Sequence, residues 1–225
     1  MRKSILSLIF SALLATMGFT TSSNAIGLEG LGLGFSIGES GYYAVGEEVT
    51  DNRKSGEDYA KKAGAFADEW GSVFIEYTAG PVTFGIDYAL ADIVTPEATN
   101  AQWTSDSDKT ALTNTVKATF ENHLTAYVII PVFRALYLKA GAISVDITTN
   151  ETLGTGGEYG NTDTTGLTAG FGFQREIKDG VSIRAEAMYS EYDNVKLTNS
   201  KNTSTSVSIT DMMGATGKVS IVKTF

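Results

Sequence analysis

Residues 31–45 read LGLGFSIGESGYYAV, and large apolar side chains alternate with small or polar ones through most of this stretch. Leu31, Leu33, Phe35 and Ile37 occupy odd positions, whereas the even positions between them hold glycine and serine. Successive residues of a β-strand point to opposite faces of a sheet. The stretch therefore predicts a strand with one apolar face and one face of small residues.

The same alternation recurs in three further segments, at residues 82–91, 166–174 and 181–190. Four weaker candidate strands bring the number to eight: 72–79, 115–130, 136–148 and 207–225. In the third of these weaker strands the apolar positions change phase between Gly141 and Ile143, which we interpret as a β-bulge.

Short and long connections alternate strictly between these strands. The short links are 80–81, 131–135 and 178–180, and the long polar links are 46–71, 92–114, 149–164 and 193–206. This alternation is typical of bacterial barrels, which have tight periplasmic turns and extended external loops. It places both chain ends on the periplasmic side, which requires an even number of strands.

The sequence thus predicts an all-β fold, an eight-stranded antiparallel up-and-down transmembrane β-barrel. A soluble barrel would enclose the apolar faces, and eight strands leave too little room for Phe, Tyr and Leu from every strand. With the faces exchanged, large apolar side chains meet lipid and small residues line the bore. We expect an interior polar network of nine residues: Glu76, Asp87, Lys117, Glu121, His123, Lys139, Arg184, Glu186 and Lys218.

Two interpretations of this network stay open. Buried charges need partners, so the residues can form a filled structural plug, as in most eight-stranded barrels. Alternatively they gate a narrow ion path. We favour the plug.

The start of the chain is typical of a secretory signal peptide. Two positive charges precede an uncharged apolar stretch, and small residues follow at Ser23 and Ala25. We expect residues 1–25 to be removed and residues 26–225 to form a single barrel domain. We expect the chain to be exported, and no later apolar run is long enough for a membrane helix. An exported chain that spans a membrane with strands is a barrel of the outer membrane.

Composition excludes several other classes of protein. The formal net charge is −9, and removal of two signal-peptide cations makes it −11 (−9 minus 2), which disfavours nucleic acid as a partner. The chain has no Cys and one His, so disulfides and zinc sites are not expected. Acidic loop residues show no EF-hand spacing, and we expect neither a metal nor a cofactor.

Residues 166–195, reading GLTAGFGFQREIKDGVSIRAEAMYSEYDNV, resemble a hairpin of small OmpA-like outer-membrane β-barrels. Residues 135–142, reading ALYLKAGA, and the terminal Phe225 also fit this family. The resemblance implies insertion by the outer-membrane assembly machinery, with Phe225 as the assembly signal and both termini in the periplasm. Lys223 departs from the pattern, because the family often carries an aromatic residue at that position.

No residue pattern marks a catalytic site. His123 is the single histidine, and no serine stands in a Gly-x-Ser-x-Gly turn. We therefore expect a structural or surface-interaction barrel whose partners are outer-membrane lipids and lipopolysaccharide. The alternatives are a narrow channel for small or hydrophobic solutes, resembling OmpW-type barrels, and more remotely a lipid-modifying enzyme.

Overall fold

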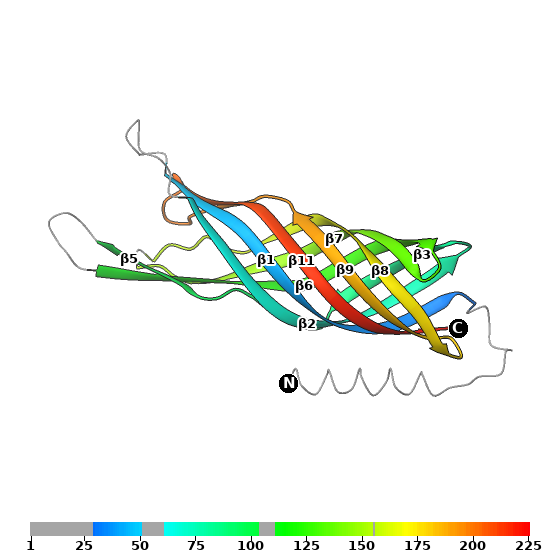
Figure 1. Ribbon diagram of the computed structural model, residues 1–225. Coiled ribbons are helices and arrows are strands. Elements are labelled where there is room, and N and C mark those ends of the chain that lie inside the picture. Colours follow the sequence, from blue (N-terminus) through cyan, green and yellow to red (C-terminus); the bar gives the residue numbers. More distant parts are fainter. Residues whose placement is uncertain (1–28, 51–60, 104–110, 155) are drawn as a thin grey trace.

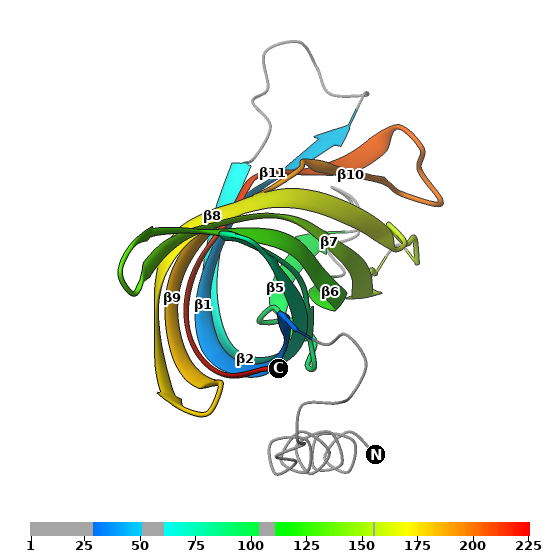
Figure 2. The same ribbon diagram turned by 90° about the vertical axis from the view of Figure 1, so that its right-hand side faces the viewer.

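The computed structural model describes residues 29–50, 61–103, 111–154 and 156–225. The predicted signal peptide lies outside these residues, as do parts of the first two long loops. Figure 1 shows an elongated barrel of steeply tilted strands, and Figure 2 looks along it from the end that carries the C-terminus. The described residues contain no helix long and apolar enough to cross a membrane.

Eight strands form a closed ring. In order around it they are β1 (Leu31–Thr50), β2 (Lys61–Ala79), β3 (Val82–Ala89), β6 (Ala111–Phe133), β7 (Leu136–Thr152), β8 (Thr162–Lys178), β9 (Val181–Tyr192) and β11 (Thr205–Thr224). All pairings are antiparallel, and β11 closes the ring on β1. The predicted eight-stranded antiparallel barrel is confirmed.

The two ends of the barrel differ as the link lengths predicted. Tight turns join the strands at one end, where the N–H of Phe225 donates to the carbonyl of Leu31 over 2.9 Å. At the other end the strands run further than expected, and β2 already begins at Lys61. Stretches predicted to be loop also contain three short strands: β4 (Ile93–Val94), β5 (Ala98–Trp103) and β10 (Val195–Thr198).

Near the turn end, the wall has an apolar outside and a small, polar inside. Leu167 and Phe171 are 71% and 61% exposed on the outer surface, whereas Ser36 and Ser72 are completely buried. An apolar band around the outside of a closed barrel is a surface for lipid. The chain is therefore an integral barrel of the membrane-spanning kind.

Two strands reverse their faces partway along the barrel. Asn122 of β6 and Asp211 of β11 have left-handed backbones, with φ of 53° and 52°. At Asn122 the register between β6 and β7 shifts by one residue, and beside Asp211 the register between β1 and β11 shifts in the same way. Such bulges insert residues on one strand, so the parity that points inward changes. Tyr127 faces the interior below the first bulge, and Phe120 faces it above.

β7 changes polarity without a bulge, so the predicted bulge between Gly141 and Ile143 is wrong. Its pairing with β8 is continuous from Leu136 to Ile147. Even-numbered positions of β7 face lipid and odd-numbered positions face inward along the whole strand. The apolar residues move from even positions such as Leu138 to the odd positions Ile143, Val145 and Ile147. Towards the loop end, the interior consequently becomes apolar.

One side of the ring is open near the loop end. β2 pairs with β3 only between Ser72 and Ala79, and β4 and β5 then follow β6. In the part of the chain that the structure describes, no strand pairing joins residues 61–71 to β4 or β5. The N–H of Val94 donates to the carboxylate of Asp68 over 3.2 Å across this gap. We call the gap the seam; Figure 1 shows β5 diverging from the ends of β1 and β2.

The left-handed residue of β6 yields a first prediction. Asn122→Val forces a β-branched residue into a backbone that disfavours it, and we expect the free energy of unfolding to fall by about 1–2 kcal/mol relative to Asn122→Gly. Both variants lose the side-chain bonds of Asn122 to Tyr88 and Asp146, so their difference isolates the backbone. Urea unfolding of the refolded proteins measures it, and equal stabilities would contradict a strained bulge.

Candidate functional site

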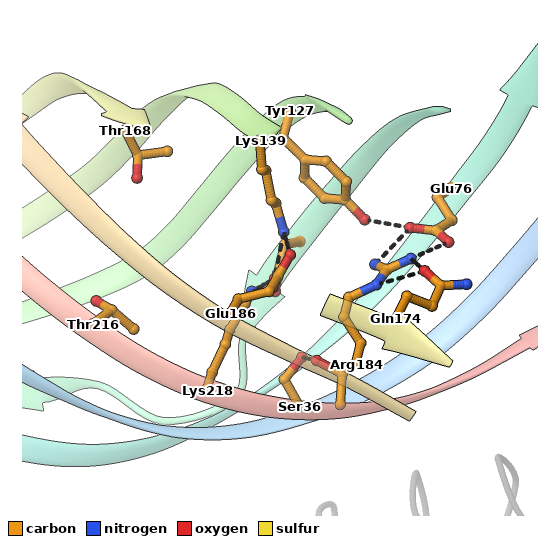
Figure 3. Close-up of polar contacts among 12 residues, drawn as sticks. Ser36, Glu76, Tyr127, Lys139, Thr168, Gln174, Arg184, Glu186, Thr216 and Lys218 are labelled. Atoms are coloured by element: carbon orange, nitrogen blue, oxygen red, sulfur yellow. Dashed lines mark hydrogen bonds and ion pairs between the residues drawn. The ribbon is translucent and has the colours of Figure 1, made fainter. Parts of the chain in front are cut away.

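Arg184 of β9 organises one half of a charged layer across the bore. Its guanidinium donates to both carboxylate oxygens of Glu76, over 3.0 and 2.9 Å, and to Gln174 Oε1 over 3.0 and 2.7 Å (Figure 3). The Tyr127 hydroxyl donates to the same carboxylate over 3.0 Å. Because Arg184 is only 2% exposed, this bidentate pairing replaces its lost water contacts.

Glu186, two residues further along β9, organises the other half. Its carboxylate lies 3.1 Å from Lys139 Nζ and 3.3 Å from Lys218 Nζ, and it accepts a 2.8 Å bond from the Tyr137 hydroxyl. Lys218 also binds Asp87 over 2.6 Å. One carboxylate therefore holds two lysines, one from the adjacent strand β11 and one from β7, two strands away in the other direction.

The two halves form one electrically balanced group. The charged layer consists of three cations and three carboxylates: Lys139, Arg184, Lys218, Glu76, Asp87 and Glu186. Lys139 Nζ lies 3.8 Å from the centre of the Tyr127 ring, which links Glu186 to the side of the layer that holds Glu76. All six side chains are buried, and each has an oppositely charged partner.

The structure brings together six of the nine residues expected in the interior network. Lys117 and Glu121 are not among them, because beyond the bulge at Asn122 the odd-numbered positions of β6 face outward and the even-numbered ones face inward. Glu121 instead accepts a 3.4 Å bond from the Thr148 hydroxyl. The expectation assumed a single phase along the whole strand, and that assumption is wrong. His123 does point into the lumen, on the loop side of the charged layer.

Sequence reasoning missed three uncharged partners of the layer, Gln174, Tyr127 and Tyr137. The signal was present, because all three lie at inward positions of their strands. The Tyr137 ring also lies over Gly172, where a Cβ would come within 2.2 Å of it. A glycine opposite an inward tyrosine makes room for the ring inside a narrow barrel.

Four aromatic or imidazole rings form the next level, which we call the aromatic floor: Tyr42, Trp70, His123 and Tyr192. The His123 ring lies 6.4 Å from those of both Trp70 and Tyr192, centre to centre, and its Nε2 is 3.3 Å from the Tyr192 hydroxyl. Trp70 Nε1 donates to Ser40 Oγ over 2.8 Å, and Lys218 Nζ lies 5.8 Å from the Trp70 ring. The floor therefore rests directly on the charged layer.

A cavity of about 400 Å³ lies on the loop side of the floor. Its walls include Ala118 and Phe120 of β6 and Val145 of β7, and we call it the chamber. Beside it, Ile147, Val195, Leu197 and Met212 form a buried apolar cluster that fills another part of the lumen. The chamber is a part of the lumen beside this cluster that side chains leave unfilled.

The seam leads into the chamber. Ala65 and Phe66 of β2 line one side, and Ile93 and Pro96 line the other. The described residues around the chamber include no lysine or arginine, and Glu97 is their single carboxylate. The chamber is therefore apolar, closed below by the floor and reached from the side.

The loop end of the apolar cluster carries Tyr159. Burial raises the pKa of its hydroxyl above the usual value, and the carboxylate of Glu48 raises it further. The hydroxyl thus stays protonated at neutral pH and donates to Glu48 Oε1 over 3.5 Å.

No protein-family model matches the chain, and none of the curated proteins does. Among solved structures, it is similar to the outer membrane protease OmpT of Escherichia coli, with 8% identity, a TM-score of 0.52 and coverage of 92% of this chain and 100% of that one. OprG of Pseudomonas aeruginosa gives 16% identity, a TM-score of 0.48 and coverage of 85% and 97%. At these identities the likeness concerns the fold alone, which is that of outer-membrane β-barrels.

The charged layer yields a second prediction. Glu186→Ala leaves Lys139 with no carboxylate partner in the structure, and we expect the free energy of unfolding to fall by about 3–5 kcal/mol. Glu191→Ala on the exposed face of the same strand should change it by less than about 0.5 kcal/mol. Urea unfolding in detergent micelles compares the two. Similar small losses would show that the buried pairs contribute little.

Proposed function

We propose that this outer-membrane barrel has a closed bore and acts as a structural or surface-interacting protein, not as a channel through the membrane. The observation that carries the proposal is the charged layer, in which three cations and three carboxylates from five strands pair across the lumen. Their partners Tyr127, Tyr137 and Gln174 occupy the space between them.

An ion crossing this layer would have to separate buried pairs. Removing one partner of such a pair costs on the order of 3–5 kcal/mol, because the other charge is left without water or a counter-charge. The aromatic floor adds a second obstruction immediately above. Both features favour the structural plug over the ion gate that the sequence had also allowed.

The proposal includes orientation and partners. The start of β1 and the end of β11 lie with the tight turns, which supports a periplasmic position for that end and a surface position for the seam and the loops. The backbone of Phe225 pairs with Leu31 at the closure of the ring, which supports a role for this residue in assembly. Lipid and lipopolysaccharide are the surroundings that the apolar exterior requires.

We also propose that the barrel is not an enzyme. The fold does not decide this, because OmpT shares it and is a protease. What supports the proposal is the setting of His123, whose Nε2 lies beside a tyrosine hydroxyl and whose ring lies beside Trp70.

Conductance in planar bilayers provides the third prediction. The refolded wild-type protein should give no current steps, and Lys139→Ala should remain silent because Lys218 still binds Glu186 beneath the floor. Lys178→Ala, at the exposed turn end, is the matched control. Steps in the wild type would contradict a closed bore, and steps confined to Lys139→Ala would identify the layer as a gate.

A further inference from the structure

We propose that the chamber is a binding site for a small, neutral, apolar molecule that enters through the seam. The site is separate from the closed bore, because the aromatic floor divides it from the charged layer. Tyr42, His123 and Tyr192 of the floor line it on the turn side.

The chamber results from changes in two strands, β6 and β7, at about one level. The bulge at Asn122 turns Ala118 and Phe120 of β6 inward, and the sequence of β7 changes so that Val145 faces inward as well. Below this level the interior is polar, and between the floor and the charged layer side chains leave only about 40 Å³. Above it the apolar walls leave about 400 Å³ unoccupied, within the range of roughly 300–1,000 Å³ typical of small-molecule sites.

The lining selects against charged ligands. An anion would lose its water and meet no lysine or arginine among the described lining residues. A cation would find a single carboxylate, Glu97. The polar groups of the lining are the His123 imidazole and hydroxyls such as those of Tyr192 and Thr164, and they suit one hydrogen-bonding group on an otherwise apolar molecule.

The seam supplies the entrance, because the floor obstructs the bore. Gly64 and Ala65 are small, so they do not obstruct the β2 side of the opening. Pro96 on the other side has no N–H with which to extend a strand ladder. Just below, the outer face carries apolar residues such as Tyr88 and Leu124, which belong to the lipid-facing surface. An apolar molecule dissolved in the membrane can therefore reach the seam directly from the lipid.

Fluorescence quenching tests the site. A single-tryptophan reporter, Phe66→Trp in a background that carries Trp70→Phe and Trp103→Phe, is reconstituted in vesicles and titrated with a neutral bromoalkane or the bromoalkanoate of equal chain length. Ala118→Phe fills the chamber, whereas Ala126→Phe makes the same change on the lipid side of the same strand. Heat-modifiable gel migration shows that each variant folds, and Val116→Phe replaces Ala118→Phe if that variant does not.

We expect saturable quenching by the bromoalkane, at least about tenfold weaker binding of the bromoalkanoate, and a similar loss in Ala118→Phe but not in Ala126→Phe. Equal binding of the two probes, equal effects of the two variants, or no saturable quenching would each overturn the proposal. So would vesicles of brominated phospholipid that quench the reporter fully, since bilayer chains would then fill the chamber. The closed bore is tested separately by conductance, so either proposal can fail alone.

Discussion

The pairs of Arg184 with Glu76 and of Lys218 with Asp87 join strands across a narrow ring, and Glu186 connects Lys218 with Lys139, so that every charge in the layer is buried with a partner. Eight strands enclose a space that side chains can fill, so any charge placed there must find its partner inside the wall. The remaining features of the lower barrel follow from this requirement. Glycines such as Gly172 and serines such as Ser36 line the bore because ion pairs and tyrosine rings already occupy its centre.

The upper barrel obeys the same geometry with opposite chemistry. A strand can exchange its inner and outer faces by inserting a residue, and Asn122 and Asp211 do this in left-handed conformations that short polar side chains tolerate. β7 reaches the same result by a change of sequence alone. The inner surface thus becomes apolar above the charged layer, and the cluster around Ile147 and Met212 packs there.

Alternation in the sequence was enough to predict the ring, its exchanged faces and six members of the charged layer, because the phase of a strand follows directly from residue parity. It failed for Lys117 and Glu121, since nothing local marks Asn122 as the site of a bulge. The apolar shift after Gly141 was detected, but it was assigned to the backbone when it belonged to the side chains. The chamber lay beyond prediction, because it depends on a bulge in β6 and a change of sequence in β7 at the same level.

The balance of the charged layer also determines the electrostatics of the chamber. Three cations and three carboxylates cancel, so the layer presents no net charge to the space above it, although Lys218 Nζ is 5.8 Å from the Trp70 ring of the floor. Selection against ions in the chamber must then come from loss of hydration at apolar walls and not from repulsion by the layer. Stability and recognition are consequently assigned to separate levels of one lumen, and the aromatic floor is the boundary between them.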